Sequence, residues 1–403
     1  MEDTRMTKYR TIDCIILLSA LATCTGIADP AAAAPPAYTV TDLGTLGGTG
    51  SAGLGINASG QVTGDSGTIG DAASHAFLWT PTTPNGTSGT MQDLGTLGGK
   101  ESQGDGINAS GQVTGVSSTT EDAAYHAFLY DGTMHDLGTL GDNSSYGNGI
   151  NDSGHVTGVS ATGSLTHAFL YDGTLHELDT LDETSSNGQG INASGQVTGF
   201  SGSDAFLWTP TTPNGNIGTA IFLGGLGGFL SSGSGINAGG QVTGESRTTE
   251  DTYHAFLYDG TLHDIGTLGG TYSAGYGINA GGQVTGESST PGDAAYVAFL
   301  YTSGSGMVDL NTLIDPLSGW KLGIGRAIND AGQITGYGYI NDYIHAFLLT
   351  PVPEPASVAL LALGLPLLVW RNSRQLGTGG VQGVRRFALA AATRAVTVAR
   401  SDQ

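Results

Sequence analysis

The stretch GINASGQVTG at residues 55–64 has the glycine content of a phosphate-binding loop, but it is repeated along the chain. Identical or close copies stand at 55–64, 106–115, 149–158, 190–199, 235–244, 277–286 and 327–336. Copies that recur every 41 to 51 residues indicate a repeat architecture, which has to be settled before any single motif is interpreted. No helix pattern follows the glycines, so we interpret the stretch as a strand–turn–strand corner and not as a nucleotide site.

One repeat, residues 93–138, contains short segments rich in Val, Ile, Thr, Phe and Tyr, bounded by Gly, Asn and Asp. This pattern predicts four strands, around GDGIN, QVTGVS, HAFLY and TMHDLG, and no helix. Asn108 to Gly111 predicts a turn in which the Asn side chain bonds to the backbone two residues on and the Gly takes a positive φ. The Ile before the Asn and the Val or Ile two residues after the Gly are expected in the core.

Four strands in roughly 45 residues match one blade of a β-propeller. The first DLG segment, Asp42–Gly44, precedes the first GIN, whereas the last AFL, at 346–348, has no DLG after it. We therefore predict an all-β, seven-bladed β-propeller of four-stranded repeats over residues 35–351, closed by pairing of the N-terminal strand with the last repeat. The alternative is a β-solenoid or another stacked β-repeat array.

Charge and cysteine content exclude several kinds of partner. The 403 residues carry a formal net charge of −22, and between Tyr38 and Pro351 four Lys and Arg face 29 Asp and Glu. Such a surface repels nucleic acid.

Weak Ca²⁺ binding at the acidic loops 119–125 and 248–254 is left open, and with it a calcium-stabilised adhesin as a minor alternative. Both cysteines, Cys14 and Cys24, precede the repeats.

Residues 1–34 predict a signal peptide. Arg5, Lys8 and Arg10 precede an apolar stretch at 15–24 that is too short to span a bilayer, and small residues follow it. We therefore expect an exported protein.

Residues 352–374 resemble the PEP-CTERM sorting signal of Gram-negative bacteria. The matching positions are Pro353, Glu354 and Pro355 for the triplet, 356–370 for the hydrophobic helix, and Arg371 with Arg374 for the basic end. The resemblance implies transient anchoring in the inner membrane by the helix, processing by an exosortase, and release or attachment at the cell surface. A basic extension, 375–403, departs from the usual signal, and a plain C-terminal membrane anchor is the alternative.

The repeat itself resembles the HAF family of extracellular repeats over about 38–350. The HAF triplets begin at His75, His126, His167, His254 and His345. Two repeats depart from the triplet, with Asp204 and Val297 in place of His. The resemblance implies location and architecture, but no reaction.

No catalytic motif stands out, and a histidine repeated in most units is expected to serve hairpin geometry. The candidate ligand contacts are aromatic residues of the last repeat, Trp320, Tyr337, Tyr339 and Tyr343. We predict a non-enzymatic cell-surface or extracellular-matrix protein that binds polysaccharide or another surface component, with no cofactor, metal or catalytic residue assigned. The alternative is a secreted glycan hydrolase or lyase, which would need paired carboxylates at one end of the ring, unlike their counterparts in other repeats.

Overall fold

The computed structural model describes residues 37–178 and 184–352. These ranges hold 28 β-strands and four three-residue 3₁₀ turns, so the predicted all-β class is confirmed. The predicted signal peptide, sorting signal, hydrophobic helix and basic extension (1–34, 352–374 and 375–403) lie outside the described residues, apart from Val352.

The strands follow one another in groups of four. The first groups are β2 (Gly47–Ile56), β3 (Val62–Thr68), β4 (Ser74–Pro81) and β5 (Gly89–Asp93); β6 (Gly98–Ile107), β7 (Val113–Thr119), β8 (Tyr125–Tyr130) and β9 (Met134–Asp136); β10 (Ser145–Ile150), β11 (Val156–Thr162), β12 (Leu165–Tyr171) and β13 (Leu175–Glu177); and β14 (Ser186–Ile191), β15 (Val197–Ser201), β16 (Asp204–Pro210) and β17 (Gly218–Gly224). The remaining groups are β18 (Gly227–Ile236), β19 (Val242–Thr248), β20 (Tyr253–Tyr258) and β21 (Leu262–Asp264); β22 (Ser273–Ile278), β23 (Val284–Ser289), β24 (Tyr296–Thr302) and β25 (Gly306–Asp309); and β26 (Lys321–Ile328), β27 (Ile334–Ile340) and β28 (Tyr343–Pro351), joined by β1 (Tyr38–Asp42). The 3₁₀ turns are η1 (Ile69–Asp71), η2 (Thr120–Asp122), η3 (Pro291–Asp293) and η4 (Leu310–Thr312).

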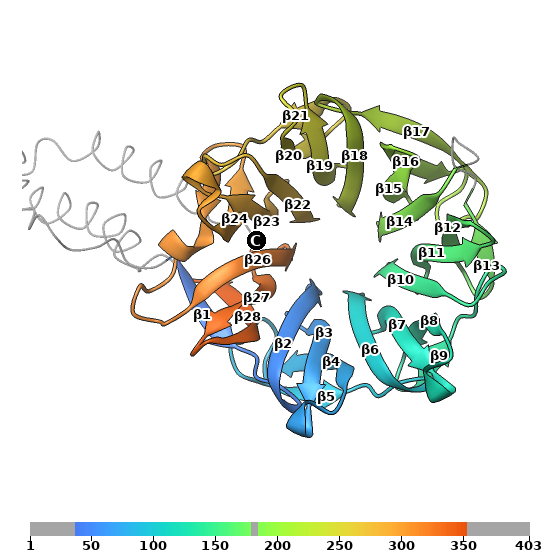
Figure 1. The fold of residues 1–403 in the computed structure, drawn as a ribbon, viewed down its shortest axis with the longest axis horizontal. Coiled ribbons are helices and arrows are strands. Elements are labelled where there is room, and N and C mark those ends of the chain that lie inside the picture. The colour runs from blue at the N-terminus through green and yellow to red at the C-terminus, as the bar shows by residue number, and fades with distance from the viewer. Residues whose placement is uncertain (1–36, 179–183, 353–403) are drawn as a thin grey trace, which may run out of the picture. The chain divides into compact units, whose positions relative to one another are not determined.

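Within each group the neighbouring strands pair antiparallel. Five sheets have four strands, and one has eight because a single parallel bridge, Ser74 to Glu101, joins two groups. The N-terminal β1 is the outermost strand of the sheet β1-β28-β27-β26, with Tyr38 opposite Pro351 and Asp42 opposite Phe347. Figure 1 shows the sheets around a central opening, with the first strand of each group innermost. The fold is a β-propeller, as predicted, and not the stacked array that was the alternative.

The cores lie between neighbouring sheets, and each draws on two repeats. One cluster joins Ala127 and Leu137 of one repeat to Ile150, Val156 and Phe169 of the next. Adjacent residues of a strand point to opposite faces, so the Ala of each AFL packs towards one neighbour and the Phe towards the other. The expected burial of the Val or Ile that follows the turn is confirmed in every repeat, whereas the Ile before the Asn ranges from buried to half-buried.

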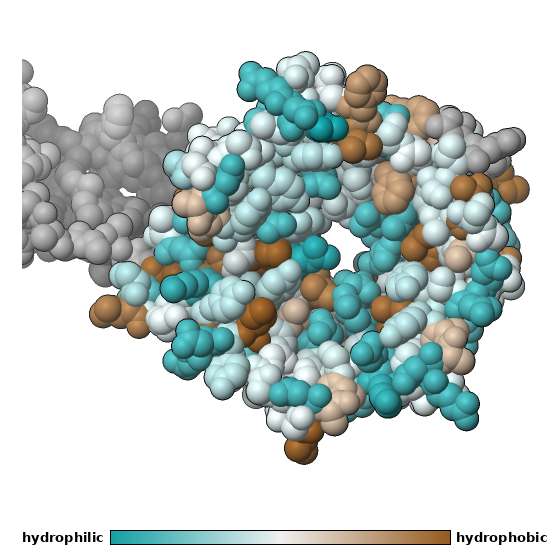
Figure 2. All heavy atoms as spheres, viewed as in Figure 1, coloured by the Kyte–Doolittle hydropathy of each residue, from teal (hydrophilic) through white to brown (hydrophobic). Residues whose placement is uncertain are grey.

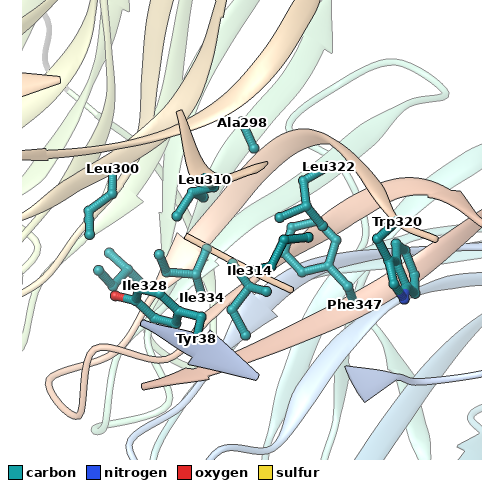
Figure 3. Packing of buried hydrophobic residues seen from close by; sticks show 11 residues of the cluster. Tyr38, Ala298, Leu300, Leu310, Ile314, Trp320, Leu322, Ile328, Ile334 and Phe347 are labelled. Carbon is teal, nitrogen blue, oxygen red and sulfur yellow. The ribbon is translucent and has the colours of Figure 1, made fainter. Parts of the chain in front are cut away.

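The largest cluster lies where the N-terminal strand joins the last repeat. Tyr38 of β1 lies beside Ile328 and Ile334 of the last repeat, and the cluster extends to Phe347 of that repeat and to Leu300 of the preceding sheet (Figure 3). The two ends of the repeat region are thus held together by apolar burial as well as by the β1–β28 ladder.

The predicted turn is confirmed. The backbone N–H of Ser59 donates to Asn57 Oδ1 at 3.1 Å, and the N–H of Gln61 donates to the same oxygen at 3.0 Å. Gly60 has φ +80°, a conformation that favours glycine, and the six equivalent glycines also have positive φ. Asn57 Nδ2 in turn donates to Gln61 Oε1 at 2.8 Å.

The same asparagine makes a second contact that the sequence did not predict. Its Nδ2 donates to the main-chain oxygen of the equivalent Asn in the next repeat, and the last bond returns to the first Asn. These bonds are Asn57–Asn108 (3.0 Å), Asn108–Asn151 (3.1 Å), Asn151–Asn192 (3.2 Å), Asn192–Asn237 (3.1 Å), Asn237–Asn279 (3.0 Å), Asn279–Asn329 (3.2 Å) and Asn329–Asn57 (3.1 Å). We call this set the asparagine ring. All of its members are buried.

The ring predicts the effect of an isosteric change. Asn192→Asp replaces the donor of one buried bond, to Asn237 O, and one part-buried bond, to Gln196 Oε1, by an acceptor. We expect the free energy of unfolding in a denaturant titration to fall by about 2 kcal/mol, because a buried and a half-buried acceptor lose their donor. The control is Asn143→Asp at an exposed position, which should leave stability almost unchanged. Equal stability of the two variants would contradict the role of the ring.

Candidate functional site

A cavity of about 380 Å³ lies on the axis of the ring, lined by the innermost strands. Figure 2 shows the opening at the centre of the ring, with hydrophilic residues at its rim. Most of the lining is shared by the repeats, namely the Ile of G-x-G-I-N and the glycine before it, which is Ala327 in the last repeat. The residue x differs in every repeat: it is Leu54, Asp105, Asn148, Gln189, Ser234, Tyr276 and Arg326.

The residue at this position can differ between repeats because the local backbone leaves it out of the strand pairing. The register of the first two strands shifts between the flanking residues in every repeat, as between Gly53 and Gly55, which is the mark of a β-bulge. A bulged residue has no cross-strand partner and is re-aimed, here towards the axis. The features that the repeats share do not predict a role for this position; the available signal is a variable residue inside an otherwise repeated stretch.

A second variable position lies on the next strand, in T-G-x-S. Its occupants are Asp65, Val116, Val159, Phe200, Glu245, Glu287 and Tyr337. The three carboxylates stand on β3, β19 and β23, so the charged residues of both positions gather on the part of the ring where its two sequence ends meet. The opposite part is neutral, and there Asn148 Nδ2 donates to Asn187 Oδ1 at 2.8 Å.

Two tyrosines hold two of the carboxylates. The Tyr276 hydroxyl donates to Glu287 Oε1 at 2.7 Å, and the Tyr272 hydroxyl donates to Glu245 Oε2 at 3.1 Å. Burial, reinforced by the adjacent glutamate, raises the pKa of both tyrosines far above the ordinary value. Both phenols therefore stay protonated, and each remains a hydrogen-bond donor to its glutamate.

Asp105 is the most perturbed carboxyl of the cavity. Burial raises its pKa to about 7; Asp65 contributes in the same direction, while Gln103 and Arg326 oppose the shift. Gln103 Nε2 donates to Asp105 Oδ1 at 2.9 Å. Burial also raises the pKa of Asp65 and of Glu245. Asp105 is thus an acid group of the cavity that can take up a proton near neutral pH.

The predicted aromatic face of the last repeat is not formed. Trp320 is only 9% exposed and packs edge-on against Phe347, with ring centroids 6.0 Å apart. Tyr339 and Tyr343 are 51% and 53% exposed, but their register on β27 and β28 sends them to opposite faces of the sheet. Tyr337 is half-buried and lies near the axial charges, where burial raises its pKa. Of the four candidates, only Tyr337 joins the site.

The HAF histidines lie on the third strand of their groups and bind carboxylates of the strand outside them. The pairs are His75–Asp93 (2.9 Å), His126–Asp136 (2.8 Å), His167–Glu177 (2.7 Å), His254–Asp264 (2.9 Å) and His345–Asp42 (2.9 Å). Where Asp204 replaces the histidine, Phe222 occupies the position of the partner carboxylate. The triplet therefore links two strands, and its loss in one repeat is matched by loss of the partner.

The acidic loops considered for Ca²⁺ already have protein partners. Asp122 Oδ1 accepts from the N–H of Lys100 at 2.8 Å, and Asp251 forms an ion pair with Arg247 at 2.6 Å. Over residues 37–178 and 184–352, no three His, Cys, Asp or Glu side chains lie close enough together to hold a metal ion. Ca²⁺ binding stays an untested prediction. None of the helical turns in these ranges has the length and apolar character needed to cross a bilayer.

Comparison with known proteins finds no matching family model and no match among curated proteins. Among solved structures, the chain is similar to the β-propeller domain of the Trilobed protease from Pyrococcus furiosus (11% identity, 63% of this chain and 86% of that chain, TM-score 0.40). It is also similar to TolB from Acinetobacter baumannii (12%, 69% and 76%, TM-score 0.37) and to a mutant sialidase of Trypanosoma rangeli with trans-sialidase activity (9%, 86% and 63%, TM-score 0.41). At this identity the likeness is one of fold, and the fold described above rests on the strand pairings themselves.

The Asp105 environment predicts a pH dependence of stability. A carboxyl whose pKa is raised in the folded state loses stability as the pH climbs from its unfolded pKa, about 4, to its folded pKa, about 7. We expect the free energy of unfolding to fall by about 2 to 4 kcal/mol over that interval from this residue, and Asp105→Asn to abolish this part of the decline. The measurement is denaturant unfolding at several pH values, with the exposed Asp142→Asn as control. Parallel profiles for the wild type and Asp105→Asn would contradict the assignment.

Proposed function

We propose that the protein is an exported, non-enzymatic repeat protein that binds polysaccharide, or another hydroxylated surface component, in the axial cavity. The observation that carries the proposal is the convergence of side chains that differ between repeats on one place, whereas the residues shared by the repeats serve the scaffold. Rigid scaffolds commonly present variable binding residues in this way.

The chemistry of the lining suits a sugar. Gln189 offers an amide donor and acceptor, Asn148 offers its Oδ1 as an acceptor, the carboxylates accept from hydroxyls, and Arg326 donates. The Ile residues and Tyr276 add apolar surface of the kind that packs on sugar rings. A cavity of about 380 Å³ is also within the size range of small-ligand sites.

We further infer that the ring has seven blades and is closed by β1. The asparagine ring supports this count, since it has one member from each sequence repeat and returns to its first. The β1–β28 ladder and the His345–Asp42 pair supply to the last repeat the fourth strand that its own sequence lacks. On this count the eight-stranded sheet is two blades joined by one bridge.

Binding without turnover is the expected behaviour. On a glycan array the purified protein should retain a defined set of polysaccharides, and the retained glycans should release no reducing sugar during prolonged incubation. A matched variant, Gln189→Ala, removes an axial amide and should weaken binding about tenfold or less, the usual cost of one or two neutral hydrogen bonds. The exposed Gln92→Ala should have no effect, although Gln92 donates to Tyr130 Oη. If the protein bound none of the glycans on the array, this result would contradict the proposed polysaccharide binding.

A second candidate is a secreted glycan hydrolase or lyase, and one observation favours it. Asp105 is a carboxylate unlike its counterparts in the other repeats, and Asp65, Glu245 and Glu287 are carboxylates at a position that is uncharged in the remaining four repeats. A carboxyl with a raised pKa, such as Asp105, is suited to general-acid catalysis. Release of reducing or unsaturated sugar that is lost in Asp105→Asn would establish this candidate in place of the first.

We propose that residues 1–34 direct export and that an exosortase-type enzyme processes the chain at Pro353–Pro355, leaving the propeller at the cell surface or outside a Gram-negative cell. Mass spectrometry of the mature protein should then find a C-terminus near Pro353 and no residues 375–403. An intact tail that reaches Gln403 would refute this processing and favour a plain anchor.

A further inference from the structure

Arg326 differs from the other basic residues of the described chain. Lys100 and Arg247 form ion pairs with Asp122 and Asp251, at 3.9 and 2.6 Å, and Lys321 is exposed to solvent. Arg326 is half-buried, lines the axial cavity and forms no ion pair within residues 37–178 and 184–352. Its charge lowers the pKa of Asp105, but no carboxylate of the described residues pairs with it directly. A guanidinium that faces a cavity without a direct carboxylate partner is available to an anionic ligand.

The guanidinium is held in place without using up its donors. Its Cζ lies 4.6 Å from the centroid of the Tyr276 ring, a stacking distance for a cation and an aromatic face. Tyr276 is itself fixed by its bond to Glu287. The Arg326 Nε is buried with no hydrogen-bond partner among the described residues, so at least this donor is unsatisfied.

We propose that Arg326 binds the carboxylate of an acidic sugar, so that the axial cavity selects uronic-acid-containing polysaccharide. Guanidinium and carboxylate are matched in shape and form two parallel N–H···O bonds, which makes arginine the usual residue for this recognition. Gln189 and Ser234 line the same cavity and are available to the sugar hydroxyls, and Asn148 can accept through Oδ1 while its Nδ2 donates to Asn187 and Gly188. The inference rests on the proposed polysaccharide binding and adds the chemical class of the ligand.

The other charges of the cavity determine the pH dependence of this binding. The titratable groups that surround Arg326 and Asp105 on the neighbouring strands are Asp65, Glu245, Tyr276, Glu287 and Tyr337. Glu287 accepts from Tyr276, and Asp105 accepts from Gln103. Asp105 takes up a proton around pH 7, and the raised pKa values of Asp65 and Glu245 act in the same direction. Arg326 stays charged throughout, so repulsion of an anionic sugar weakens as the pH falls, and binding tightens.

The test is calorimetric titration of the purified protein with three probes of matched length, oligogalacturonate, malto-oligosaccharide and chitosan oligosaccharide, and with acetate alone. We expect oligogalacturonate to bind at least about tenfold more tightly than the neutral probe, which is the scale of a charge-assisted bond. Arg326→Gln should remove this preference, and Arg326→Lys should keep only part of it, because lysine cannot bind the carboxylate through two parallel bonds. The control is Lys321→Gln, an exposed cation on the same strand, which should bind as the wild type does.

The outcomes separate this inference from the proposed function. A preference for the neutral or the amine-bearing probe, or unchanged oligogalacturonate binding in Arg326→Gln, overturns the inference and leaves polysaccharide binding intact. Binding of none of the probes and of nothing on the glycan array overturns both. Acetate binding as tight as that of the sugar assigns the site to small organic acids and overturns the saccharide part.

The pH profile is an independent readout if Arg326→Gln does not fold. In the wild type the affinity for oligogalacturonate should rise at least about threefold between about pH 8 and pH 6, because Asp105 gains a proton over this range. Asp105→Asn should bind at pH 8 as the wild type does at pH 6. A flat wild-type profile would contradict the arrangement of charges around Arg326.

Discussion

The bond from each buried asparagine amide to the main chain of the next repeat is the interaction on which the rest of the molecule depends. One side chain satisfies its own turn through Oδ1 and ties two repeats together through Nδ2, as Asn57 does with Ser59, Gln61 and Asn108. Only an uncharged amide offers an acceptor and two donors at this size. Seven such bonds follow one another around the axis and return to the start, so each repeat is bonded to both of its neighbours in the same way.

Close approach at the axis follows from the same geometry. The innermost strands can converge because glycine faces threonine across each sheet interface; a Cβ on Gly53 would collide with the Thr335 hydroxyl, which itself donates to Phe347 O. The repeated glycines thus serve backbone approach and turn conformation, not a ligand. What remains free to vary is the bulged residue between them, and the ring places all of its versions around one cavity. The repeat builds the scaffold, and the departures from the repeat carry the chemistry that we propose.

Much of this could be predicted from the sequence, for a physical reason. A turn of the type Asn-x-x-Gly depends on residues within five positions of one another, so the corner, its positive-φ glycine and the burial of Val62 follow from local pattern. The positions of the aromatic candidates depend on tertiary structure and could not be predicted from local pattern. Trp320 is buried because it packs edge-on against Phe347, a residue distant in the sequence. Tyr339 and Tyr343 point to opposite faces of the sheet because of the β27–β28 register, which composition does not reveal.

Periodic, short-range patterns in the sequence are enough to predict the all-β class, the repeat, its turn and the need of the last unit for the N-terminal strand. Which variable residues meet depends on the tertiary structure. Asp105 and Arg326 belong to different repeats far apart in the chain, yet both line the axial cavity, with the stacked Tyr276 and the bonded Glu287 beside them. Their proximity is set by the curvature of the ring, which arises from packing between sheets and from the asparagine bonds. This curvature cannot be read from any local stretch of the sequence.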